Sequence, residues 1–166
     1  MSTDPERAGG ERTARRSTAW LLRALLTLQA TMAIAQPVFI GRYLDGDFDQ
    51  LSNHATNGSV LPAFALLCIG GSLAHWTYGR GRFWPVPVTV LLVPVEGAQI
   101  AAGYAHNLAL HIPLGTSLIA LVLFLAIWSW TPRIRIARGR RPRVEPAPAD
   151  RNPGSPHLQP VPGGSA

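Results

Sequence analysis

Two histidines, His54 and His111, open two apolar segments of the chain, and each is followed by a glycine four residues later. On a helix, residues four apart lie one turn apart on the same face, so Gly58 and Gly115 each leave bare backbone beside an imidazole. Two neutral imidazoles that face each other can ligate a haem iron from both sides. A flat macrocycle also needs a bare surface to lie against. The pattern therefore indicates a cofactor site shared by two helices.

The same imidazoles also suit a zinc or copper site, which would need further His, Cys or carboxylate ligands. His106 and Asp49 are the candidates that the sequence offers for this role. A third interpretation makes each histidine a capping or interfacial residue without any ligand. The sequence shows no constellation of nucleophile, base and acid, so we nominate no catalytic residue and do not predict an enzyme.

The elements that must position these histidines are four apolar spans, at about residues 18–40, 54–78, 84–104 and 110–130. As a helix, each span is long enough to cross a bilayer, which takes about 20 residues. The spans show no wide polar stripe, which argues against a soluble bundle. We therefore predict an all-α fold, an up-down-up-down four-helix transmembrane bundle over residues 18–132. The polar segment 1–17 and the Arg/Pro-rich segment 133–166 are predicted to be disordered tails.

The distribution of arginine predicts the orientation in the membrane. The net charge is +6, and all 15 basic residues are Arg. They gather in the N-terminal tail, in the 79–83 link and after residue 130, whereas the 41–53 link is acidic. The positive-inside rule then places both termini in the cytoplasm of a multi-pass plasma-membrane protein. Because the arginines flank apolar spans and do not line one face of a domain, we expect the lipid bilayer as partner and no nucleic acid.

A carboxyl and three amides lie inside the spans. Glu96 is the only acidic residue deep within one, where an ionised group is costly and usually faces the bundle interior. It is a proton carrier, a partner for His or Arg, or a protonated carboxyl bound to a neighbouring helix, and the last interpretation is simpler because no second carboxylate or buried cation is visible to pair with it. Gln29, Gln36 and Gln99 are expected to form interhelical hydrogen bonds.

Arg42 is the one arginine on the predicted outer side. It either pairs with Asp45 or Asp47, or meets an anionic group of a bound ligand, such as a haem propionate. Of the remaining histidines, His75 is expected at the cytoplasmic interface, and His106 is expected to be solvated in the outer link.

Two runs of sequence resemble parts of a known family. EGAQIAAGYAHNLALHIPLGTSLIALVLFLAIW resembles the last two helices of one half of a haem A synthase, and HATNGSVLPAFALLCIGGSL resembles the His-opened helix before them. The resemblance covers roughly residues 20–132 and implies that His54 and His111 are the axial pair of a cytochrome b-type bundle. The family has two such halves and a substrate-oxidising site, and this chain has one half and no such site. The Arg-only, Ala/Pro/Gly-rich composition also resembles that of small actinobacterial-type integral membrane proteins.

The expected function follows from these residues and from the resemblance. We expect an integral membrane protein that binds haem b through His54 and His111 and transfers electrons or senses redox state, with a membrane redox partner. Two alternatives remain open. One is a cofactor-free structural or interaction subunit of a membrane complex. The other is a small proton-coupled carrier that uses Glu96, for which the prolines of the third span hint at a broken helix. The sequence does not indicate an oligomeric state.

Overall fold

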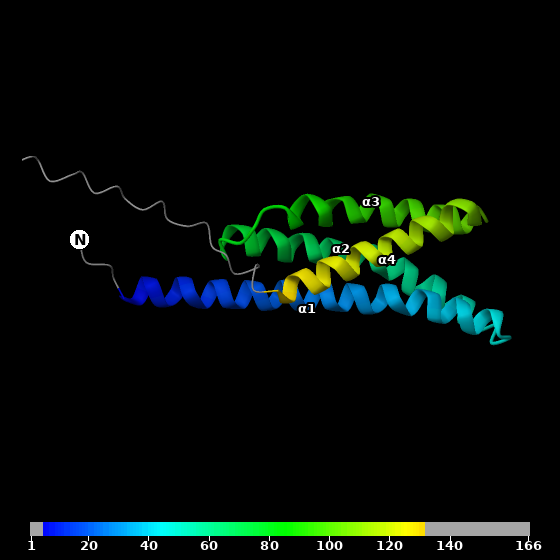
Figure 1. The fold of residues 1–166 in the computed structure, drawn as a ribbon, viewed down its shortest axis with the longest axis horizontal. Coiled ribbons are helices and arrows are strands. Elements are labelled where there is room, and N and C mark those ends of the chain that lie inside the picture. Colours follow the sequence, from blue (N-terminus) through cyan, green and yellow to red (C-terminus); the bar gives the residue numbers. More distant parts are fainter. Residues whose placement is uncertain (1–4, 132–166) are drawn as a thin grey trace, which may run out of the picture.

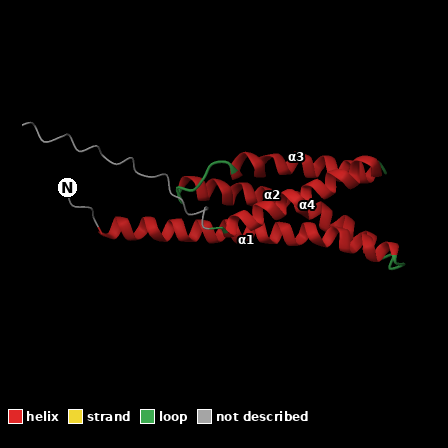
Figure 2. Cartoon of the chain, viewed as in Figure 1, coloured by secondary structure: helices red, strands yellow, loops and turns green. Residues whose placement is uncertain are grey.

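The computed structural model of the chain describes residues 5–131, and these form four helices (Figures 1 and 2). The helices are α1 (Pro5–Leu44), α2 (Gln50–Thr77), α3 (Pro85–Tyr104) and α4 (Leu108–Trp130). Each contains a segment long and apolar enough to cross a membrane, which in α1 is Thr13–Leu44. The predicted fold class, an all-α bundle of four transmembrane helices, is confirmed. The tail predicted at 133–166 lies outside the described residues.

Helix α1 begins much earlier than predicted. Residues 5–17, which the sequence analysis assigned to a disordered tail, are helical, and for them that prediction is wrong. Pro5 stands at the first position, where its fixed φ suits a helix and its missing N–H leaves no hydrogen bond unmade. The residues that follow are rich in Ala, Arg and Glu, which favour helix. Helix α1 therefore extends beyond the N-terminal limit of its apolar span.

Each helix packs against two neighbours, because α1 and α3 both contact α2 and α4. Helices α2 and α4 thus lie on one diagonal of the bundle, and α1 and α3 lie on the other, as in an up-down bundle. We call the end with links 45–49 and 105–107 the histidine end, and the end with link 78–84 the arginine end. Figure 1 shows the α1–α2 hairpin diverging from the α3–α4 hairpin toward the histidine end.

The buried apolar core occupies the arginine end and the middle of the bundle. Its members are Leu22, Leu26, Ala30, Ala33, Ala65, Cys68, Leu92, Leu118, Val122, Leu125, Ala126 and Trp128. At the arginine end the buried Arg23 donates from Nε to the carbonyl of Ser129 at 2.9 Å. Its guanidinium also lies 5.2 Å from the ring centroids of both Trp20 and Trp130, a cation–π arrangement that fastens α1 to α4. Large apolar side chains remain exposed on all four helices, as expected of a surface that faces lipid.

The link 78–84 folds closely over His75. This histidine was expected at the interface, but it is only 2% exposed. A Cβ on Gly79 would lie 2.5 Å from the carbonyl oxygen of His75, and a Cβ on Gly81 would strike the imidazole itself. Between them, Arg80 adopts φ 50°, and the amide of Gly81 donates to the His75 carbonyl at 2.8 Å. The two glycines of this link are therefore required by the close approach of the backbone.

Candidate functional site

The two predicted ligands lie next to each other at the histidine end, with their rings in an edge-to-face arrangement. His54 is in the second turn of α2, and His111 is in the first turn of α4. Their ring centroids are 6.1 Å apart, with an angle of 64° between the ring planes. Because α2 and α4 lie on a diagonal of the bundle, the two rings meet between α1 and α3. Both side chains are half-buried, so the pair is neither solvated like a surface histidine nor part of the apolar core.

Each imidazole has a backbone carbonyl of the neighbouring helix near its Nδ1. The Nδ1 of His111 lies 2.9 Å from the carbonyl oxygen of Gln99, and the Nδ1 of His54 lies 3.4 Å from that of Gln36. A carbonyl oxygen only accepts, so the short contact makes His111 Nδ1 a donor and leaves its Nε2 unprotonated. Among the described residues no hydrogen bond reaches the Nε2 of either ring. His111 thus has the arrangement of a histidine that binds a metal through Nε2.

The side-chain amide of Gln36 completes the surroundings of His54. In the orientation that suits its neighbours, Oε1 accepts from the Gly58 amide at 2.8 Å and from Asn57 Nδ2 at 3.2 Å, and Nε2 donates to the His54 carbonyl at 3.2 Å. Nε2 then donates to His54 Nδ1 at 2.5 Å. Rotating the amide by half a turn presents Oε1 to the same nitrogen. That orientation would also set Oε1 against the His54 carbonyl and Nε2 against the Gly58 amide, so in the favoured one His54 Nδ1 accepts, whereas His111 Nδ1 donates to the Gln99 carbonyl.

The two glycines face these glutamine side chains. A Cβ on Gly115 would lie 2.6 Å from Gln99 Nε2, and a Cβ on Gly58 would lie 3.1 Å from the end of the Gln36 amide, at the position that Oε1 takes in the favoured orientation. The sequence analysis expected the glycines to leave space for a flat macrocycle. In the structure the side-chain amides of Gln36 and Gln99 occupy the space beside these glycines. Each hairpin thus carries the same triad of a glutamine, a histidine and a glycine. We call these six residues the paired triads.

The sequence analysis gave Gln36 and Gln99 only a general role in interhelical hydrogen bonding and missed them as partners of the histidines. A signal was present, because each hairpin has a glutamine before the link and a histidine after it at comparable distances along the chain. Antiparallel packing brings such residues to the same depth. The atoms that contact the histidine Nδ1 atoms are backbone carbonyls, however, and every residue has one. The identity of the residue therefore does not reveal these contacts.

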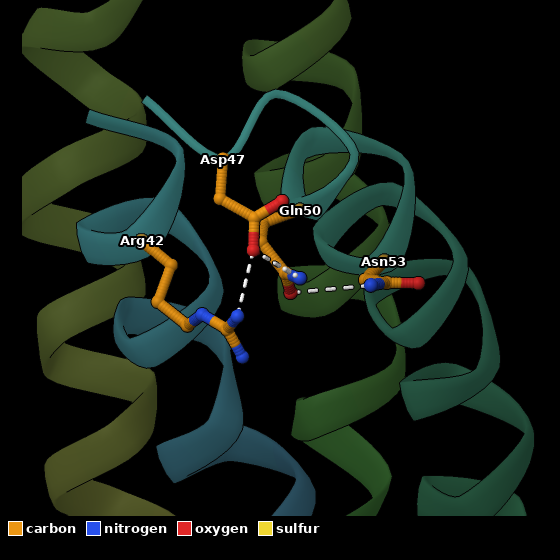
Figure 3. A network of polar contacts seen from close by, with 4 residues as sticks. All are labelled: Arg42, Asp47, Gln50 and Asn53. Carbon is orange, nitrogen blue, oxygen red and sulfur yellow. Dashed lines mark hydrogen bonds and ion pairs between the residues drawn. The ribbon is translucent and has the colours of Figure 1, made fainter. Parts of the chain in front are cut away.

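The other nominated residues do not join the histidine pair. Arg42 donates from Nη2 to Asp47 Oδ2 at 2.7 Å, and the same oxygen accepts from Gln50 at 2.9 Å (Figure 3). The ion-pair alternative for Arg42 is thus the one that the structure contains. His106 is exposed in the link and has φ 54°. The described part of the chain contains no group of three or more His, Cys, Asp or Glu placed to hold a metal, so His106 and Asp49 do not complete a zinc or copper site.

Comparison of the chain with protein-family models, with curated proteins and with solved structures finds no match. The resemblance to one half of a haem A synthase therefore rests on the sequence motifs alone. The fold itself defines the class, because four helices of this length and hydropathy make the chain a multi-pass integral membrane protein. Within that class, its distinguishing feature is a half-buried histidine pair on the diagonal of a four-helix bundle.

Proposed function

We propose that the protein is a small membrane cytochrome in which His54 and His111 ligate haem b, and that it transfers electrons or senses redox state. The separation of the two rings carries this proposal. An imidazole nitrogen binds a metal at about 2.0–2.1 Å, so imidazoles on opposite sides of one metal have ring centroids roughly 6 Å apart. The observed separation is 6.1 Å. A direct hydrogen bond between the rings would bring them about 1 Å closer, because its heavy atoms are about 3 Å apart.

The number of protein ligands favours haem over a bare metal ion. A porphyrin supplies four nitrogens in its plane, so the protein needs to add only two axial ligands. A zinc or copper site takes three or four protein ligands, and no such group of His, Cys, Asp and Glu occurs within the described residues. Haem, if bound, would supply one-electron chemistry, and His54 and His111 would hold it.

The paired triads have distinct tasks in this proposal. The carbonyl of Gln99 orients His111 through Nδ1, which strengthens a ligand and fixes its tautomer. His54 takes the same tautomer only when the Gln36 amide leaves its Nδ1 and the Gln36 carbonyl, 3.4 Å away, accepts from it. The amides of the same two residues must swing away from Gly58 and Gly115 to admit a porphyrin, and the three torsions of a glutamine side chain allow that. An anionic propionate at this end would compete with Asp47 for Arg42.

The proposal also includes an orientation. The arginine end lies at the cytoplasmic face of the plasma membrane, and the histidine pair lies near the outer face. The arginines of link 79–83 and the acidic residues of link 41–53 support this through the positive-inside rule. A redox partner would then reach the site from the outer side or from within the membrane.

The reduced-minus-oxidised spectrum of protein purified from haem-replete cells tests the proposal. The wild type should show a low-spin haem spectrum, and His54→Ala and His111→Ala should each lose it. His106→Ala, at an exposed position, and His75→Ala, at the opposite end, should keep it. Gly115→Leu should lower haem occupancy by filling the space beside the pair. A colourless wild type would refute the proposal and leave a cofactor-free structural or interaction subunit as the function.

A further inference from the structure

A second polar pair lies inside the bundle, deeper than the histidines and on the other diagonal. Gln29 of α1 and Glu96 of α3 are 0% and 5% exposed, and Gln29 Nε2 donates to Glu96 Oε1 at 2.7 Å. Glu96 stands near the middle of α3, between Pro85 and Tyr104. Gln29 lies seven residues, or about 10 Å, along α1 from Gln36. The pair therefore crosses the bundle near the middle of the membrane.

Two oxygens of this pair are buried and have no hydrogen-bond partner among the described residues: Gln29 Oε1 and Glu96 Oε2. Both are acceptors while Glu96 is ionised, so they cannot satisfy each other. A protonated carboxyl has one O–H donor, and the unpaired amide oxygen belongs to the side chain that Glu96 already contacts. One proton on Glu96 Oε2 therefore satisfies both oxygens, because the resulting O–H can donate a hydrogen bond to Gln29 Oε1.

The surroundings offer no cation to an ionised Glu96. The Cys68 thiol of α2 is buried within electrostatic range of it and is not a cation. On α1 the nearest cation along the helix is Arg23, six residues from Gln29 or about 9 Å toward the arginine end. On α4 the titratable group is His111, at the histidine end. No ion pair reaches Glu96 in the part of the chain that the structure describes.

We propose that Gln29 and Glu96 form a proton-binding site in the middle of the membrane. Glu96 binds one proton, and its O–H donates a hydrogen bond to Gln29 Oε1. Gln29 Nε2 donates to Glu96 Oε1, so the carboxylic acid and the amide form two hydrogen bonds in opposite directions. The bound proton removes a charge that the membrane makes costly. This inference does not depend on haem, and it gives the interior of the bundle a ligand that the histidine pair does not use.

The polar residues around the site indicate the side from which the proton arrives. Toward the arginine end, apolar core residues such as Leu22 and Leu92 lie next to the pair, and the buried hydroxyls of Thr89 and Ser72 lie farther along. Toward the histidine end, Gln99 lies one turn from Glu96 on α3, and its Oε1 is a buried acceptor without a partner in the described residues. Its backbone carbonyl contacts His111. Because Gln99 is the polar side chain nearest to Glu96 along α3, we infer that the site exchanges its proton with the histidine end.

Infrared spectroscopy of the protein in phosphatidylcholine vesicles tests the site directly. Glu96 is the only Asp or Glu within the four candidate spans, so a buried-carboxyl C=O band that disappears in Glu96→Gln belongs to it. We expect this band at neutral pH. Gln29→Leu should shift it to higher frequency, because the carbonyl loses its donor, and Thr31→Val, at an exposed position on the same helix, should leave it in place. In D₂O, Gln99→Leu should slow its isotope shift.

A difference spectrum that shows a carboxylate at neutral pH would overturn the proposal, and so would an unchanged band in Gln29→Leu. An unchanged isotope exchange in Gln99→Leu would overturn the route from the histidine end. If the Glu96 variant does not assemble, the wild type still decides the question, because a protein without any buried-carboxyl band does not hold this proton. Colourless protein gives the same spectrum, so this result stands apart from the haem test.

Discussion

Replacing Gly115 by alanine should leave the protein less stable than the same replacement at Gly97, which should stabilise it. Both glycines lie inside helices, where alanine is favoured over glycine by about 1 kcal/mol. A Cβ at Gly97 meets nothing within 4 Å, so that position gains the full difference in helix propensity. A Cβ at Gly115 would lie 2.6 Å from Gln99 Nε2, closer than non-bonded atoms pack. The amide of Gln99 must therefore move.

The size of the effect follows from two opposing terms. Overpacking a well-filled site costs about 1–3 kcal/mol, and the helix propensity of alanine returns about 1 kcal/mol. Gly115→Ala should thus lose up to about 2 kcal/mol, and the two alanine variants should differ by about 1–3 kcal/mol in unfolding free energy. For a chain of this size that difference corresponds to roughly 2–12 °C in melting temperature.

Thermal unfolding in detergent micelles, followed by circular dichroism, measures this difference. A double-mutant cycle identifies its cause, because in a Gln99→Ala background the added Cβ meets no amide and Gly115→Ala should cost nothing more. Gly58→Ala, with a contact of 3.1 Å to Gln36, should fall between the other two glycine variants. The reasoning fails if Gly115→Ala raises the melting temperature as Gly97→Ala does, or if its penalty survives the loss of the Gln99 side chain.

Gly81→Ala should lower the melting temperature, because its Cβ would clash with the buried His75 ring. An unchanged melting temperature would contradict this and would show that link 78–84 can shift to relieve the clash. Asp47→Asn should change the unfolding free energy by less than about 1 kcal/mol, because exposed ion pairs contribute little and the side chains of Arg42 and Asp47 are 63% and 37% exposed. A larger loss in a denaturation experiment would contradict that. A topology reporter fused within link 79–83 should report from the cytoplasm, and an external signal there would reverse the predicted orientation.

Hydropathy by itself determined the four helices, because backbone in lipid must satisfy its hydrogen bonds within one segment and a helix does so. The predicted spans 84–104 and 110–130 differ from α3 and α4 by at most two residues at any end. The start of α1 was not predictable in this way, because outside the lipid the helix depends on local propensity and not on hydropathy. The common depth of the two histidines was also predictable, since both open helices that run in the same direction.

Only the tertiary structure decided what surrounds those histidines. Their separation of 6.1 Å depends on how α2 and α4 are rotated, and packing against neighbouring helices sets that rotation. The partners of the imidazoles include the backbone carbonyls of Gln36 and Gln99, and a backbone carbonyl cannot be recognised as a partner from the residue type. In the same way, the sequence marked Glu96 as costly in a membrane, but only the packing of α1 and α3 across the bundle supplied Gln29 as its partner.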